Sequence, residues 1–222
     1  DPKHFIEAGK VIEQIGADGI DINMGCPAAK IVSSCYGSAL IRRPDLAAEL
    51  VAAATKSVGI PVSVKTRLGW DTHETLIPFC QKLIEAGAKA LAIHGRSYND
   101  KFTGSANWDP IYELKKSVSV PVLGNGDIAS VEDAKAKLKN LDGIMVGRGT
   151  FGNPWLMADL IASLQRGEDV KRKDDAAEKL QLFRTRVPFI LEHCKLAMRW
   201  KGEERGILEM RRHFSSYAKG FD

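Results

Sequence analysis

The sequence predicts an α/β fold: five parallel strands of a (β/α)8 TIM barrel within residues 1–165, followed by a small helical domain at 166–222. Short β-type runs alternate strictly with amphipathic helical patterns, which is typical of parallel strands joined by helical crossovers. Polar residues recur at the carboxyl ends of those runs, where such a barrel carries its active site. The chain has 14 Lys and Arg against 10 Asp and Glu in 166–222, whereas 1–165 is balanced. This change near Arg166 sets the predicted domain boundary.

Composition places the chain among soluble globular proteins. Its 222 residues are 44% hydrophobic and 27% charged with a mean hydropathy of −0.18, which excludes disordered, collagen-like and membrane-spanning classes. The four cysteines show no CxxC spacing and no zinc or disulfide pattern, so we expect reduced thiols in a cytoplasmic protein. Because the first residue is Asp1 and five strands are found, we expect three further strands before it, and poor stability without them.

The predicted strands and helices follow one another with recognisable boundaries. Proline in a first helical turn and a Ser–Asp capping pair mark where helices begin. These signals stand at Pro44, Asp109–Pro110, Ser130 with Asp133, and Asn153–Pro154. The strands are expected at Gly19–Asn23, Val62–Arg67, Ala90–His94, Val120–Asn125 and Gly143–Val146.

Alternation within the strands separates polar and apolar residues onto opposite faces. The polar face ends in a polar or ionisable group on four strands, and another follows the fifth: Asn23, Lys65, His94, Asn125 and Arg148. A doubly wound sheet buries both faces under helices and would not place such groups on strand after strand. A (β/α)8 barrel does so, because its active site lies at the carboxyl ends of its strands.

Two glycine-rich turns follow directly after the last two strands, at Gly124–Asp127 and Gly147–Gly149. In barrels of this kind these loops commonly bind phosphate, because glycine lets backbone N–H groups approach the anion and arginine adds a bidentate donor. The alternative is that both are tight turns without a ligand. The occurrence of two such turns in these positions favours phosphate.

Three side chains stand out as chemical candidates. Lys65 lies in mid-strand on a face that should be buried, which is costly for a charge unless it meets an anion or an electron-rich ligand. His94 is a weaker signal, because a histidine at a strand end is more often a hydrogen-bonded structural residue. Cys26 lies in a loop after a strand and before a proline, so it is a candidate nucleophile or acid. Cys80 and Cys194 fit the ordinary reading of a small buried hydrophobe.

Together these motifs closely resemble the tRNA-dihydrouridine synthase family. The matching strings run in family order over nearly the whole chain. The Asn-x-Gly-Cys-Pro string is specific, whereas glycine turns are shared by many phosphate-binding barrels. The strings are Asp21–Pro27, Val64–Gly69, Ile93–Arg96, Gly124–Ile128, Gly147–Gly149 and Gly152–Trp155.

The resemblance implies a TIM-barrel catalytic domain that binds FMN, with NADPH as reductant and tRNA as substrate. Cys26 would be the general acid that protonates C5 of the uracil while reduced flavin delivers hydride to C6. Lys65 and His94 would contact the isoalloxazine ring, where a cation near N1 stabilises the reduced, anionic flavin. Asn23 and Arg67 would contact the target uracil. The flavin phosphate would be held by Asn125, Gly126, Asp127, Gly147 and Arg148, and no metal site is expected.

The tail from Glu203 has the pattern of an amphipathic helix. Its apolar face is expected to carry Ile207, Met210, Phe214 and Tyr217. Without further information, the opposite side of this helix is expected to be an ordinary solvent-exposed face. With the resemblance, the string Arg211–Gly220 is similar to the family's tRNA-facing helix, in which phosphate contact is independent of sequence. The substrate-binding cations are then Arg205, Arg211, Arg212 and Lys219. In the preceding helical pattern, Pro188 should kink or split the helix.

Two other functions compete with tRNA reduction. An FMN barrel acting on a free pyrimidine, as dihydroorotate dehydrogenases do, would share the barrel motifs but would not need the C-terminal helices. A tRNA-binding remnant without catalysis would share the helices but hold no flavin. The sequence leaves open which tRNA uridine is modified and what oligomer forms.

Overall fold

The computed structural model describes residues 1–168, 170 and 176–219, with the side chains of 176–179 left aside. Gly220, the last residue of the tail string, lies outside the described residues. By its internal contacts the chain divides into two compact units. The first comprises Asp1–Asp127 with Lys135–Val146, and the second comprises Ile128–Ala134 with Gly147–Asp222. Within the described ranges, no helix is long and apolar enough to cross a membrane.

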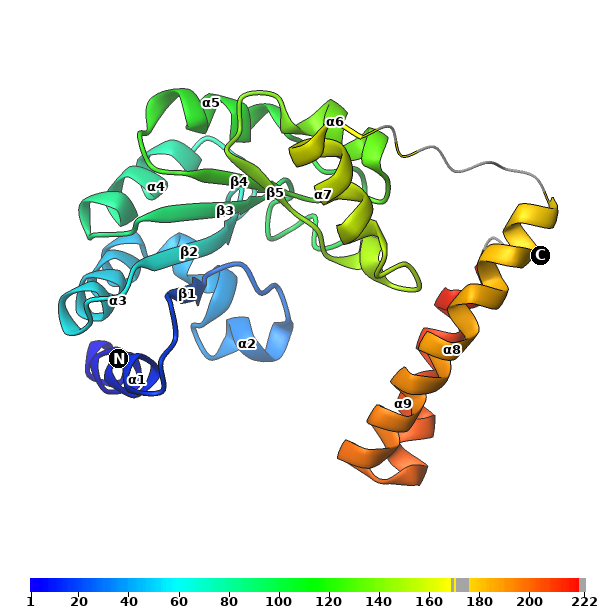
Figure 1. Ribbon diagram of the computed structural model, residues 1–222. Coiled ribbons are helices and arrows are strands. Elements are labelled where there is room, and N and C mark those ends of the chain that lie inside the picture. The colour runs from blue at the N-terminus through cyan, green and yellow to red at the C-terminus, as the bar shows by residue number, and fades with distance from the viewer. Residues whose placement is uncertain (169, 171–175, 220–222) are drawn as a thin grey trace. The chain divides into compact units, whose positions relative to one another are not determined.

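The first unit contains a parallel sheet of five strands in sequential order (Figure 1). Each strand pairs with the next one along the chain, as helical crossovers in a barrel require. This order and the parallel direction confirm the strands predicted from the sequence, each within two residues of its expected ends. The strands are β1 Ile20–Asn23, β2 Val62–Arg67, β3 Ala90–His94, β4 Val122–Asn125 and β5 Gly143–Met145.

Helices connect the strands and cover one face of the sheet. The apolar face of the central strands is fully buried, with Val64, Leu91 and Ile93 at 0% exposure. Helices begin at Pro44 and Asp109 as expected, and Ser130 Oγ accepts the amide N–H of Asp133 at 3.0 Å. The helical elements are α1 Pro2–Gln14, α2 Ala29–Ser33, η1 Gly37–Arg42, α3 Pro44–Ser57, α4 Leu76–Glu85, α5 Asp109–Ser117 and α6 Val131–Leu138.

The register of the sheet brings the polar strand ends together. Asn23 pairs with Lys65 across β1 and β2, and Arg67 pairs with His94 across β2 and β3. His94 in turn pairs with Asn125 on β4. Because all five strands are parallel, their carboxyl ends lie at one edge of the sheet. The residues selected by strand alternation are therefore neighbours in space.

The second unit is helical, and its longest part is an antiparallel pair, α8 and α9. The chain reverses at Gly202, whose φ of 81° is in the left-handed region. Close approach of the two helices depends on Gly206, where a Cβ would lie 2.7 Å from the Met198 nitrogen. α8 continues through Pro188, so the proline does not split it. The elements are η2 Arg148–Thr150, α7 Leu156–Arg166, α8 Ala176–Lys201 and α9 Glu203–Ala218.

The tail helix buries only part of its predicted apolar face. Met210 and Tyr217 are buried at 1% and 5% exposure, whereas Ile207 and Phe214 are 40% and 39% exposed. Helical periodicity thus identified the correct face, but its outer members remain accessible.

A tight contact on β4 leaves no room for a side chain at Gly124. A Cβ there would lie 2.1 Å from Cζ3 of Trp108 and 2.8 Å from Cδ1 of Leu141. Trp108 is itself buried at 6% exposure, so the ring has no room to move outward. Gly143 on β5 offers a contrast, because its nearest neighbour to a Cβ is Leu123 Cγ at 3.5 Å.

We therefore expect Gly124→Ala to destabilise the fold by roughly 1–3 kcal/mol through overpacking. Gly143→Ala is the matched control and should change the free energy of unfolding by less than about 0.5 kcal/mol. Urea denaturation followed by tryptophan fluorescence measures both. Equal stability of the two variants would show that the sheet does not pack on Trp108 in this way.

Candidate active site

The loop that carries Cys26 is held by the side chain of Asn23. Its Oδ1 accepts hydrogen bonds from the backbone amides of Gly25 at 3.0 Å and Cys26 at 3.1 Å. The carbonyl of Cys26 accepts the amide of Ser38 at 3.0 Å, which fixes the other side of the loop. Cys26 is a free cysteine and is partly exposed. It is therefore presented on an ordered loop at the carboxyl end of β1.

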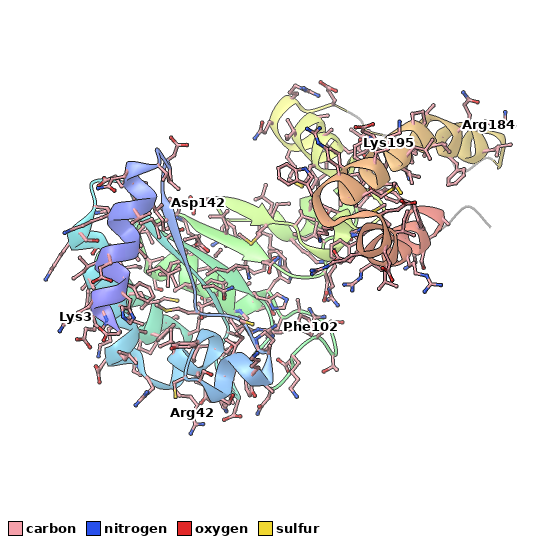
Figure 2. All side chains as sticks on the ribbon, turned by 90° about the horizontal axis from the view of Figure 1, so that it is seen from below. Lys3, Arg42, Phe102, Asp142, Arg184 and Lys195 are labelled. Carbon is pink, nitrogen blue, oxygen red and sulfur yellow. The ribbon has the colours of Figure 1, made fainter. Side chains whose placement is uncertain are left out.

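Arg67 ties this loop to the loop that follows β3. Its guanidinium is buried at 3% exposure. Nε donates to the Gly25 carbonyl at 2.9 Å, and Nη1 donates to the carbonyls of Ser97 at 2.9 Å and Lys101 at 2.7 Å. The ring of Phe102, labelled in Figure 2, lies 5.5 Å from the guanidinium carbon. Three carbonyls from two loops thus meet on one cation.

Lys65 is a partly buried cation. Among the described residues its ammonium makes no hydrogen bond or ion pair. Burial lowers the pKa of Lys65, and the charge of Arg67 lowers it further, while Asp21 acts in the opposite direction. A desolvated ammonium of this kind is stabilised by an anion or an electron-rich ligand. The partly buried ammonium agrees with the prediction from the sequence that Lys65 lies on a buried face of its strand.

His94 is held in its neutral form. It is 8% exposed, and burial followed by the charges of Arg67, Lys65 and Arg96 lowers the pKa of His94 to about 3. Asp127 opposes this shift without cancelling it. A neutral imidazole can donate one hydrogen bond and accept another at physiological pH. Any ligand beside it therefore meets a hydrogen-bonding group and not a second cation.

Arg96 and Asp127 form a bidentate ion pair that the sequence analysis did not single out. Arg96 is 2% exposed, and its Nη1 and Nη2 donate to the two carboxylate oxygens of Asp127 at 3.0 and 2.8 Å. Its Nε donates to the Thr103 carbonyl at 2.9 Å, and the amide of Ala106 donates to Asp127 at 2.7 Å. Arg96 stands two residues after His94, so strand alternation was the signal that could have found it.

This pairing engages the Asp127 carboxylate, which the sequence analysis assigned to phosphate binding. A carboxylate repels phosphate, so a contribution of Asp127 to an anion site would come from its position in the turn. Its φ of 51° places the residue in the left-handed region, where Arg96 stabilises it. The role of Asp127 toward phosphate stays a prediction.

The turn after β4 leaves the backbone amide of the buried Gly126 without a hydrogen-bond partner among the described residues. After β1 and β3 the next amide donates to the neighbouring strand, and after β2 the amide of Leu68 donates to the Arg96 carbonyl in the loop after β3. After β4, the side-chain Nδ2 of Asn125 instead donates a hydrogen bond to the Met145 carbonyl at 2.7 Å. The Gly126 amide donates no hydrogen bond among the described residues. A Cβ on Gly126 would lie 2.7 Å from Ala106 Cβ and 3.2 Å from His94 Cδ2. Only glycine fits at this buried position.

Gly147 and Arg148 belong to the second unit, and so do the four tail cations. Gly147 directly precedes η2, and its carbonyl accepts hydrogen bonds from the amide and the hydroxyl of Thr150 at 3.1 and 2.9 Å. The tail cations Arg205, Arg211, Arg212 and Lys219 are all exposed, and Arg205 pairs with Glu209 at 3.1 Å. Their roles stay predictions. The structure brings together Asn23, Cys26, Lys65, Arg67, His94, Asn125, Gly126 and Asp127 within the first unit.

Neutral His94 predicts how stability depends on pH. Its folded pKa of about 3 lies below the ordinary value of 6.5, so the unfolded chain binds more protons between these values. The contribution of neutral His94 to the free energy of unfolding is therefore complete above pH 6.5 and is lost as the pH falls. Relative to His94→Gln, the wild type should lose about 2 kcal/mol between pH 7 and pH 5, measured by urea unfolding. A constant difference across this range would contradict a neutral, buried His94.

Comparison with known proteins places this geometry in a family. The chain matches the dihydrouridine synthase (Dus) family over residues 1–222. It is 38% identical over 223 residues to "tRNA-dihydrouridine synthase B" of Pasteurella multocida, covering 99% of this chain and 65% of that protein. It is 37% identical over 223 residues to "Probable tRNA-dihydrouridine synthase" of Rickettsia bellii, covering 99% and 66%. The chain thus spans slightly less than two thirds of these relatives' length.

Solved structures support the fold alone. A dihydrodipicolinate synthase from Acinetobacter baumannii matches with a TM-score of 0.52 and 14% identity, covering 99% of this chain and 76% of that one. This likeness and the sequential parallel sheet agree with the predicted TIM-barrel architecture. By its sequence along all 222 residues, the chain belongs to the dihydrouridine synthase family.

Proposed function

We propose that the protein reduces uridine in tRNA to 5,6-dihydrouridine, with FMN as its bound flavin and NADPH as reductant. One observation carries the proposal: Asn23 and Arg67 hold the loop of Cys26 at the sheet edge that also carries Lys65 and His94. A thiol, a partly buried ammonium and a neutral imidazole suit the reduction of an electron-poor double bond beside a flavin. The names of the family relatives support the same substrate.

The residues at this edge fit a flavin mononucleotide. Among the described residues, the Lys65 ammonium and the Gly126 amide have no hydrogen-bond partner, and the amide lies beside the His94 ring. We assign Lys65 and His94 to the isoalloxazine ring. Asn125, Gly126, Asp127, Gly147 and Arg148 are proposed to hold the phosphate. When bound, the flavin supplies the hydride that adds to C6 of the uracil.

Cys26 is proposed to supply the proton. Transfer from Sγ to C5 balances the hydride added at C6 and leaves a thiolate on the enzyme. The buried guanidinium of Arg67 interacts electrostatically with Cys26, so it stabilises that negative charge. Asn23 contributes by holding the Cys26 amide, which limits where the thiol can move. The chain's own task is thus to orient the acid against one carbon of the base.

Asn23 and Arg67 keep donors for the uracil itself. The Oδ1 atom of Asn23 is engaged with the loop amides, so its Nδ2 group remains for a uracil carbonyl. Arg67 uses Nε and Nη1 for the loop carbonyls, and Nη2 has no hydrogen-bond partner among the described residues. Both residues can therefore order the loops and contact the substrate at once.

The target base has to leave the tRNA stack to reach Cys26. We propose that the helical region 166–222 holds the tRNA backbone, with Arg205, Arg211, Arg212 and Lys219 as its phosphate contacts. Their exposure suits contacts that are independent of sequence and sensitive to salt. The cytoplasm is the proposed location, because tRNA is the proposed substrate.

Replacing the proposed acid tests the function. Cys26→Ala should lower dihydrouridine formation in an unmodified tRNA by at least about 100-fold, as loss of a general acid does. Reduction of the bound flavin by NADPH should stay unchanged, because that half-reaction does not use the thiol. Mass spectrometry of nucleosides measures the product, and flavin absorbance under anaerobic conditions measures the reduction.

Cys35→Ala is the matched control, since Cys35 is an exposed cysteine with no part in the loop hydrogen bonds to Asn23. It should behave like the wild type. The proposal is wrong if Cys26→Ala also retains full activity, or if the wild type with FMN and NADPH forms no dihydrouridine in tRNA. Reduction of free uracil without reduction of tRNA would instead identify a free-base enzyme.

A further inference from the structure

Three side chains form a continuous stack beside the active-site loops. The rings of Trp70 and Tyr98 are stacked with centroids 3.9 Å apart and planes 20° apart. The guanidinium carbon of Arg42 lies 4.8 Å from the centroid of the Trp70 ring. Arg42 ends η1, Trp70 follows β2, and Tyr98 follows β3. The stack therefore joins the three connections that follow β1, β2 and β3, and Cys26 lies in the first of them.

Main-chain hydrogen bonds fix the two rings. The amide of Tyr98 donates to the Gly69 carbonyl at 2.9 Å, and the amide of Asn99 donates to the Trp70 carbonyl at 3.1 Å. The two loops are thus paired along their backbones on both sides of the stack. A platform held in this way does not depend on the rotamer of one exposed side chain.

Arg42 differs from the other arginines of the first unit. Arg67 and Arg96 are buried, and protein carbonyls or a carboxylate occupy Nε and Nη1 of Arg67 and Nε, Nη1 and Nη2 of Arg96. Arg43 is exposed and has no stacking partner among the described residues. Arg42 is exposed and stacked, and within the described ranges its guanidinium makes no hydrogen bond or ion pair. In Figure 2 it lies at the outer margin of this unit.

A guanidinium stacked on an indole keeps its N–H groups in a plane parallel to the ring. Stacking uses the face of the group and leaves the donor edge open. It also restricts the side chain in advance, so less entropy is lost when a ligand binds. Two parallel N–H donors match the oxygens of a phosphate group in bidentate fashion.

We propose that the Arg42–Trp70–Tyr98 stack is an RNA-binding platform on the barrel, with Arg42 contacting a backbone phosphate of the tRNA. The proposal rests on the proposed function, because tRNA is the polyanion that must approach these strand ends. The contact is additional to the tail cations and lies in the same unit as Cys26. The platform would hold the RNA backbone near the nucleotide that enters the active site.

Arg42→Ala should raise the Kd for unmodified tRNA roughly tenfold, since a charge-assisted hydrogen bond is lost. The slope of log K against log salt should become shallower by about 0.7–0.9, the value for one phosphate contact. Arg43→Ala, the neighbouring exposed arginine without a stack, should change Kd less than about twofold by comparison. Trp70→Leu keeps the charge but removes the platform, so we expect a Kd between those of the two arginine variants.

Thermal unfolding and dihydrouridine formation are measured on the same proteins. Arg42→Ala and Arg43→Ala with equal Kd and equal salt slope would overturn the platform. A lower Tm of Arg42→Ala at unchanged Kd would also overturn it, because the stack would then only join the loops. A wild type that binds tRNA and forms dihydrouridine beside such results would leave the proposed function intact. A wild type that does neither overturns both.

Discussion

The buried guanidinium of Arg67 is the interaction on which the candidate site depends. It gathers carbonyls from the loops after β1 and β3, which are far apart in sequence, onto one cation. Three carbonyl oxygens satisfy a charge that would otherwise be costly to bury at 3% exposure. The loop of Cys26 therefore has a defined position before any ligand arrives. Asn23 completes this order from the other side by accepting two amides of the same loop.

The ionisable groups around Arg67 differ in their charge state and in their partners. Arg96 is neutralised by Asp127, and the pair holds the turn in which the Gly126 amide has no hydrogen-bond partner among the described residues. His94 is kept neutral by burial and by its cationic neighbours. Lys65 is left as the cation without a protein partner within the described ranges. The edge thus keeps positive charge directed at a ligand, which suits an electron-rich ring or a phosphate more than a cationic or purely apolar molecule.

Much of this arrangement could be predicted from sequence because it follows from strand alternation. The positions of Asn23, Lys65, His94 and Asn125 require only period-two patterns and parallel strands, and the sheet register confirms them as neighbours. The ion pair of Arg96 with Asp127 depends on how the loop at 97–106 folds back, which no local pattern encodes. The hydrogen bonds by which Asn23 holds the Cys26 loop could not be predicted for the same reason, and the family resemblance implied only a substrate contact for this residue.

The central claim is that Arg67 orders two loops together, and amide hydrogen exchange tests it directly. In Arg67→Lys the charge remains, but the fork that reaches both loops is lost. Exchange at 24–38 and at 97–104 should then quicken together by about tenfold or more, while α5 exchanges as in the wild type. Unchanged exchange in both segments, or a change confined to one of them, would contradict the claim.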